Sequence, residues 1–232
     1  MSTNPLPGLR RAALAGAIVG LLAISASPAA ADTVPSADKS YSQNGSTAEI
    51  TVGGCIDNGD DTLTCSDEHL AVFAGKMTDG STVTHPNQIC VEIFSVTQSA
   101  LSGEWLGDPT FERGCRTDLP TTAIRFDSKL AWATLAPTTL TVEQLVCDKV
   151  ECIPGASRVV GVSGAWTQDG PLETMKYRTS FSDGTCRWSE AFKGAGRNAT
   201  FVGELDGRAI GEDSHPHLDS GKYTFRSRCD EV

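Results

Sequence analysis

Histidines are few in this sequence, and they offer the first test for a metal-binding or catalytic site. The chain has four histidines in 232 residues, and only His215 and His217 lie close together, in the segment EDSHPHLD. On an extended strand their side chains would point to the same side, as two ligands of one metal ion must. A metal site also needs ligands that converge from other parts of the chain, and the sequence specifies none. We therefore interpret the segment as a solvated loop stiffened by Pro216, and we expect neither a metal nor another cofactor.

Acidic side chains could bind calcium or act in hydrolysis. Residues 57–61, DNGDD, lack the regularly spaced carboxylates and the distant Glu of a calcium loop. A two-residue Asn-Gly hairpin turn explains the same residues more simply. Glycoside hydrolysis needs two carboxylates at a defined separation, which a sequence cannot supply. Glu92, Glu104 and Glu190 therefore remain without an assigned role.

No nucleophile motif is present either. Ser163 lies in GVSGA, which does not match the G-x-S-x-G elbow, and that elbow also needs a strand-to-helix turn. The sequence therefore favours an extracellular binding or interaction protein without catalytic activity. Two alternatives stay open. One is a small secreted hydrolase whose residues meet only in the folded chain, and the other is a protease inhibitor that presents Ile153-Pro154-Gly155 beside Cys152.

One group of cations could form an anion-binding surface. Residues 175–181 and 222–228 each alternate with the period of two that is typical of a β-strand. If the two strands lie close together, their charged side chains form a cationic face on an acidic protein. Protection of an edge strand, or plain solvation, would explain the same pattern without a ligand. The residues of this predicted face are Lys176, Arg178, Lys222, Arg226 and Arg228.

The eight cysteines form an even set, and the first of them is Cys55. No two have the C-x2-C spacing of a structural zinc site, so disulfides are the better interpretation. Two similar segments, 70–80 and 159–170, are each preceded by two cysteines and followed by two. This order predicts that each half of the chain forms its own two bonds. The predicted bonds are Cys55–Cys65, Cys90–Cys115, Cys147–Cys152 and Cys186–Cys229.

The elements that must position these residues are β-strands. Period-two alternation recurs, for example over 47–52 and 89–94, whereas sustained helical periodicity does not. Asn-Gly and Asp-Gly pairs supply turn signals between the alternating segments. Many short strands with frequent turns are typical of a sandwich or a barrel. We predict an all-β, antiparallel, β-sandwich-like fold.

The similar segments also suggest an internal duplication. LAVFAGKMTDG and VVGVSGAWTQDG both run from an apolar strand through a glycine to an Asp-Gly turn. Together with the cysteine order, they predict two similar β halves, 47–119 and 120–232, with Pro120 near the boundary. Each half has the size of a small sandwich domain.

Residues 1–31 have the pattern of a secretory signal peptide. Arg10 and Arg11 precede an apolar run, and the small residues Ala29–Ala31 follow it. We expect cleavage before Asp32, secretion to the extracellular space, and a flexible polar leader over 32–46. The apolar run is too short to span a bilayer comfortably, so we expect no membrane insertion after cleavage.

The net charge of the chain limits the classes of partner that it can bind. The formal net charge is −10, and it becomes −12 without the signal region, which holds two arginines and no acid. Residues 32–170 carry 8 basic against 19 acidic side chains, and residues 171–232 carry 9 against 10. An acidic protein is a poor general binder of nucleic acid or anionic lipid. An extracellular protein or glycan remains a possible ligand.

Four tryptophans could form a sugar-binding platform, but a role in the core explains them more simply. They are Trp105, Trp132, Trp166 and Trp188. The sequence determines neither the identity of the ligand nor the oligomeric state.

Overall fold

The computed structural model describes residues 39–147, 152–182, 186–210 and 214–229, all within one compact unit, Thr33–Val232. The regular elements of these ranges are β-strands that pair antiparallel, so the predicted all-β antiparallel class is confirmed. They are β1 (Lys39–Asp57), β2 (Thr62–Asp79), β3 (Thr82–Thr84), β4 (Asn87–Ser99), β5 (Thr110–Arg116), β6 (Ile124–Phe126), β7 (Trp132–Cys147), β8 (Cys152–Gln168), β9 (Glu173–Ser182), β10 (Cys186–Leu205), β11 (Arg208–Ile210) and β12 (His217–Cys229).

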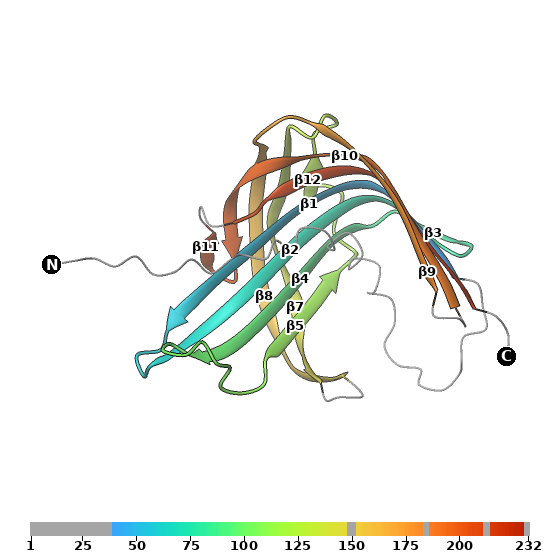
Figure 1. Cartoon of the computed structure of the whole chain (residues 1–232). Coiled ribbons are helices and arrows are strands. Elements are labelled where there is room, and N and C mark those ends of the chain that lie inside the picture. Colours follow the sequence, from blue (N-terminus) through green and yellow to red (C-terminus); the bar gives the residue numbers. More distant parts are fainter. Residues whose placement is uncertain (1–38, 148–151, 183–185, 211–213, 230–232) are drawn as a thin grey trace, which may run out of the picture. The chain divides into compact units, whose positions relative to one another are not determined.

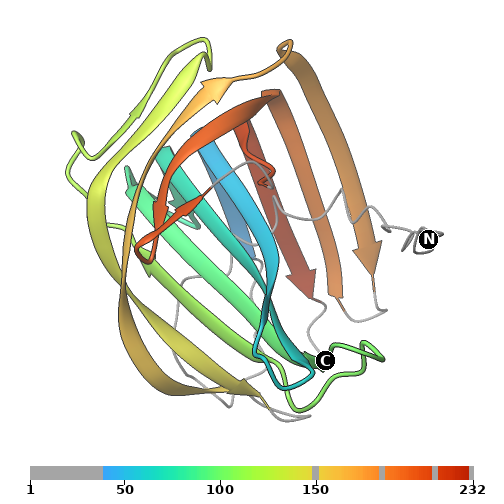
Figure 2. The same cartoon turned by 90° about the vertical axis from the view of Figure 1, so that its left-hand side faces the viewer.

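Eight of these strands form a closed sheet. Their order is β1, β2, β4, β5, β7, β8, β10 and β12, and the pairing of β12 with β1 closes the ring. Figures 1 and 2 show the long strands from two directions. The predicted sandwich is therefore replaced by one continuous sheet. Alternation shows that a strand has an apolar side, but not whether this side meets a second sheet or the far wall of its own.

The core lies inside this ring. Trp166 of β8 is fully buried, and its Nε1 donates a hydrogen bond of 2.9 Å to the backbone oxygen of Glu49 on β1. Its ring contacts Phe201 edge-on, with 4.7 Å between the ring centroids. Alternate side chains of the ring strands fill the remaining interior; Ile50, Leu70, Val72, Ile89, Val91, Val142, Val160 and Leu218 are among them.

Four glycines form a row across neighbouring strands at one end of the ring. Gly75 of β2 lies opposite Gly45 of β1, Gly45 opposite Gly221 of β12, and Gly221 opposite Gly194 of β10. A Cβ would lie 2.4 Å from a backbone oxygen of the adjacent strand at Gly45, Gly75 and Gly194, and 2.7 Å at Gly221. Only glycine fits such an approach, and glycine also permits a strand to bend sharply. Figure 1 shows these four strands curving strongly.

Beyond the glycine row the sheet continues as an open part, which we call the extension. Here β10 exchanges its neighbour β8 for β9, and β2 exchanges β4 for β3. The strand order of the extension is β9, β10, β12, β1, β2 and β3. Its residues are 39–45, 75–79, 82–84, 173–182, 186–194 and 221–229.

The predicted flexible leader is wrong over residues 39–46. These residues belong to β1 and pair with β12 on one side and β2 on the other. Their polar composition suggested a mobile segment, but backbone pairing on both sides does not require apolar side chains. Residues 32–38 lie outside the described ranges.

Both predicted halves contribute four strands to the ring, and the duplication stays a prediction. The first half supplies β1, β2, β4 and β5, and the second supplies β7, β8, β10 and β12. The halves meet where β5 pairs with β7 and where β12 pairs with β1. Residues on both sides of Pro120 therefore belong to one closed sheet.

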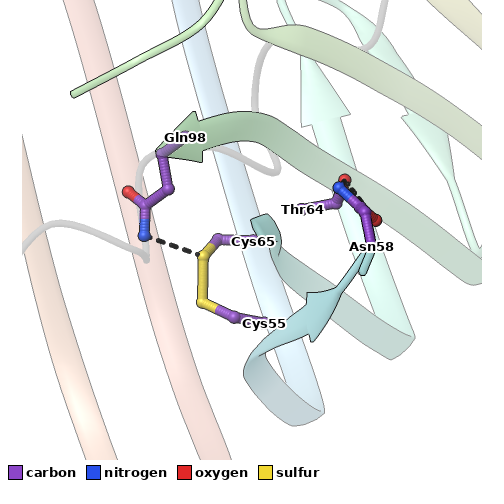
Figure 3. Close-up of a disulfide and its surroundings, with 5 residues drawn as sticks. All are labelled: Cys55, Asn58, Thr64, Cys65 and Gln98. Atoms are coloured by element: carbon purple, nitrogen blue, oxygen red, sulfur yellow. Dashed lines mark hydrogen bonds between the residues drawn. A yellow bond between two sulfur atoms is a disulfide. The ribbon is translucent and has the colours of Figure 1, made fainter. Parts of the chain in front are cut away.

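The cysteine pairs join directly opposite positions of adjacent strands. Cys55–Cys65 and Cys90–Cys115 form disulfides as predicted. Figure 3 shows the first of them with Gln98, whose amide donates a 3.2 Å hydrogen bond to the Cys65 sulfur.

The other two predicted pairs also face each other. Cys186 is disulfide-bonded, and Cys229 lies opposite it on β12. Cys147 lies opposite Cys152 in the pairing of β7 with β8, and the side chains of that pair lie outside the described residues.

Candidate functional site: a cationic face on the extension

The five predicted cations share one face of the extension. Residues directly opposite each other in antiparallel strands point to the same side of the sheet, and successive residues alternate. Lys176 of β9 lies opposite Lys193 of β10, and Lys193 lies opposite Lys222 of β12. The other predicted members, Arg178, Arg226 and Arg228, are separated from these lysines by even numbers of residues. We call this side of the extension the cationic face.

The two strands that carry the predicted cations, β9 and β12, were expected to be neighbours, and this expectation needs a correction. β9 and β12 do not pair, because β10 lies between them. β10 adds Lys193 and Arg187 to the cationic face, and Lys76 of β2 lies in the same row as Lys222, separated from it by Asn44. The sequence reasoning missed these three cations. Alternation of Arg187, Ser189, Ala191 and Lys193 with apolar or acidic residues was the signal that could have found the two cations of β10.

Three lysines stand directly opposite one another across three adjacent strands. Lys176, Lys193 and Lys222 are all exposed, and adjacent strands are about 4.8 Å apart. Like charges directly opposite in a sheet are destabilising. Within the part of the chain that the structure describes, none of the three forms an ion pair with a carboxylate. Among the described residues, the fold therefore maintains a row of positive charge without a carboxylate partner.

The carboxylates described in the extension lie on its other side. Asp79, Glu173 and Glu190 all occupy positions that alternate with those of the cations. Between the cations stand small hydroxyl side chains, such as Ser189 and Thr224. The cationic face can therefore approach an anionic ligand without a competing negative charge in these rows.

Arginines of the closed ring are held differently. Arg158 donates to Glu112 at 2.7 Å and also pairs with Asp206, and the hydrogen bond to Glu112 raises the pKa of Arg158. Arg113 pairs with Glu92 at 3.1 Å. Arg116–Asp118 and Arg208–Glu68 are further pairs of this kind. Charge neutralisation by carboxylates is thus common in the ring, whereas the described residues provide none for the lysine row.

Aromatic side chains cover the opposite side of the extension, which we call the aromatic face. Tyr177 stacks on Phe192 with 5.9 Å between the ring centroids. Phe181 stacks on Trp188 with a centroid distance of 5.1 Å. These cross-strand contacts stabilise the pairing of β9 with β10. They thereby hold Lys176 in register with Lys193 on the other side of the sheet.

Two further tyrosines anchor the centre of the aromatic face. The hydroxyl of Tyr223 donates a 2.9 Å hydrogen bond to Glu190. Burial raises the pKa of Tyr223 most, and the hydrogen bond to the Glu190 carboxylate raises it further. Burial and the nearby charge of Asp79 raise the pKa of Tyr41 to about 12. Both groups are therefore neutral donors at physiological pH. The aromatic face carries no charge from its tyrosines.

The two neighbouring histidines do not act together. His215 is exposed in the segment before β12, as expected for a solvated loop, whereas His217 begins β12. His217 Nε2 lies 3.1 Å from Asp219 Oδ1, and this hydrogen bond raises the pKa of His217. Among the described residues, no group of three or more His, Cys, Asp or Glu side chains has the arrangement of a metal site.

The acidic loop is a hairpin connection, as predicted, but it is longer than the predicted two-residue Asn-Gly turn, because Asp57 lies opposite Leu63. Asp57 accepts a 2.8 Å hydrogen bond from the backbone nitrogen of Gly59. The amide of Asn58 donates to the hydroxyls of Thr62 and Thr64 at 2.9 and 3.1 Å. The side chains of the loop thus bond to the turn itself.

The three unassigned glutamates do not converge. Glu92 pairs with Arg113, Glu190 accepts from Tyr223, and Glu104 is exposed in the connection between β4 and β5. Ser163 lines an open pocket with Arg116 and Glu204, and the lining of that pocket includes no histidine. These positions do not assemble the nucleophile and base that a hydrolase needs.

The segment predicted to be an exposed inhibitor loop is part of a strand. Ile153 and Pro154 belong to β8 and pair with Val146 and Leu145 of β7. Because the cysteine at position 152 starts a strand, this segment does not protrude as a free reactive loop in the described structure.

The tryptophans are divided among different environments. Trp166 is fully buried, as predicted for a core residue, but Trp105 and Trp132 are 56 % and 39 % exposed. Trp188 stacks within the aromatic face. Four tryptophans on separate elements do not make one continuous platform.

Comparisons with known proteins add no relative. No protein-family model, no curated protein and no solved structure matches the chain. The described residues include no helix with the length and apolar character needed to cross a membrane.

Proposed function

We propose that this chain is an extracellular binding protein without catalytic activity, and that its cationic face binds an acidic polysaccharide. The row formed by Lys176, Lys193 and Lys222 carries the proposal. A free surface gains nothing from placing like charges directly opposite one another. A bound polyanion turns this cost into an advantage, because one ligand neutralises several cations.

The geometry favours a linear ligand with a repeating charge. The lysines are spaced at about 4.8 Å from strand to strand, and Lys76 continues the row beyond Asn44. A chain of acidic sugars that lies across the strands would meet successive ammonium groups. Lys presents a compact point charge, which suits carboxylate and sulfate groups alike.

The extracellular setting has separate support. The described residues include the disulfides Cys55–Cys65 and Cys90–Cys115, and such bonds persist in oxidising compartments. The charge of the protein also favours one orientation of binding. Because the chain has a net negative charge, it repels a polyanion unless the polyanion approaches the cationic face.

A charge-reversal experiment tests the proposal. We expect the mature protein to bind dextran sulfate or polygalacturonate, with an affinity that decreases as salt is added. Lys193→Glu combined with Lys222→Glu should reduce this affinity by at least about tenfold. Comparison of the sulfated and the carboxylated polymer identifies which acidic group the face prefers.

The matched control changes the net charge equally at a different place. Arg125 and Lys129 are exposed outside the extension, so Arg125→Glu combined with Lys129→Glu should leave binding nearly unchanged. Equal losses in both double variants would show that only the net charge matters. Absence of binding to both polymers at low salt would contradict the proposal.

A further inference from the structure

The strand β9 has an open backbone edge. Each of the eight ring strands has a neighbour on both sides. The extension ends in β3, which has three residues, and in β9, which has ten. Within the described residues β9 pairs only with β10. One side of its backbone therefore has hydrogen-bonding groups that a further strand could use.

The two sides of β9 differ in chemistry. Lys176 and Arg178 are exposed on the cationic face, whereas Tyr177 and Phe181 are 37 % and 58 % exposed on the aromatic face. One ring face of each aromatic residue is stacked on β10. The other ring face is consequently turned towards the open edge. An added strand would meet cations on one side and aromatic rings on the other.

We infer that the open edge of β9 binds an extended, acidic segment of a partner protein, which joins the sheet as an additional strand. Carboxylates at alternate positions of the segment pair with Lys176 and Arg178. Apolar side chains at the intervening positions cover Tyr177 and Phe181. Strand addition combines backbone hydrogen bonds, which give affinity, with side chains of alternate direction, which give specificity.

The charge of β9 disfavours a second copy of this chain at the same edge. In the register that keeps the aromatic rings of two β9 strands on one face, Lys176 and Arg178 of both copies lie together on the other. Like charges at such positions repel, so the same residues reject self-pairing and accept an acidic strand.

This inference goes beyond the proposed function, because it requires the backbone of β9. Polysaccharide binding uses the lysine row over several strands, whereas strand addition uses one edge. Lys222 is two strands away from β9, at about 10 Å, and Lys76 is further. Lys176 belongs to both surfaces, whereas Lys222 and Lys76 belong only to the lysine row, so polysaccharide binding can be weakened without changing the edge of β9.

Blocked ten-residue peptides test the inference. A peptide of alternating Glu and Val should bind in calorimetric titration and slow the hydrogen exchange of β9 amides, and a Lys-Val peptide should not. N-methylation of one alternating set of its residues should abolish binding, because that set donates to β9, while methylation of the other set should be tolerated. Equal binding of both methylated peptides would show that charge alone acts, and would overturn strand addition.

Charge-swapped variants provide the second arm. Lys176→Glu with Arg178→Glu should reduce affinity for the Glu-Val peptide at least about tenfold and create affinity for the Lys-Val peptide. Lys76→Glu with Lys222→Glu is the matched control, and it should weaken polysaccharide binding but leave peptide affinity within about twofold. Failure of the Glu-Val peptide to bind the unmodified protein at low salt would refute the inference, whatever the result with polysaccharide.

Discussion

At the scale of single residues, the cations of this protein fall into two groups. Arg113, Arg116, Arg158 and Arg208 pair with carboxylates in the ring and at its rims. Lys176, Lys193 and Lys222 of the extension lie opposite one another instead. Exposed ion pairs contribute little to stability, so the difference matters less for folding than for what each surface can bind.

Lys193 should show a conflict between stability and binding. It stands between two other lysines, so Lys193→Gln should raise the free energy of unfolding by a few tenths of a kcal/mol by relieving repulsion. The same change should weaken polysaccharide binding. Denaturant titration and calorimetry measure the two effects, and Lys129→Gln should change neither. A loss of stability in Lys193→Gln would contradict the repulsive character of the row.

His217 should make the stability depend on pH. Its hydrogen bond with Asp219 raises its pKa above 6.5, with smaller contributions from the charges of Glu49 and Glu173. The stabilisation is therefore complete at a pH below 6.5, the pKa of the unfolded chain. It is lost as the pH rises through the higher pKa that His217 has in the folded protein. The free-energy difference between the unmodified protein and His217→Gln should be larger at about pH 5.5 than at about pH 8.5. A difference that does not change with pH would contradict the assignment.

At the scale of elements, the glycine row decides how far the strands can continue. β1, β2, β10 and β12 approach one another closely there, so that they can leave the ring and form the extension. Phe192 lies where a side chain at Gly194 would stand. This packing places an aromatic ring at the point where the strand itself has no side chain.

Substitution at this row should be costly. A Cβ at Gly194 would lie 2.4 Å from the backbone oxygen of Ser220, so Gly194→Ala should destabilise the protein by about 1–3 kcal/mol. Gly161 is the matched control, since it lies on a strand and a Cβ there would meet no atom within 4 Å. Gly161→Ala should change stability by less than about 0.5 kcal/mol. Equal effects of the two changes in thermal unfolding would argue against close approach.

At the scale of the whole molecule, chain halves that share one sheet should stay together after cleavage. The disulfide pairing predicts no bond between residues 36–119 and 120–232, while β1 pairs with β12 and β5 pairs with β7 across the halves. A protease cut in the exposed segment at Pro120 should therefore leave one particle under native conditions. Denaturant without reductant should then separate two fragments.

Size-exclusion chromatography and non-reducing mass spectrometry measure these outcomes. Fragments that remain joined in denaturant would reveal a bond between the halves, such as Cys115–Cys186, and would contradict the pairing. Fragments that separate under native conditions would contradict the closed ring.

The sequence by itself determined the local features of the fold. Alternation over 175–181 and 222–228 predicted strands and assigned Lys176 and Lys222 to charged sides, because successive side chains of any strand point in opposite directions. The order of the cysteines predicted the bonds Cys55–Cys65 and Cys90–Cys115, which the structure contains.

Only the tertiary structure decided which strands are neighbours. The insertion of β10 between β9 and β12 brings Lys193 into the row, and the pairing of β1 with β12 closes the ring. These contacts join residues that are far apart in the chain, and they depend on how the apolar sides of all strands are buried together. Alternation describes each strand alone, so it could identify a charged side but not the surface that several such sides build.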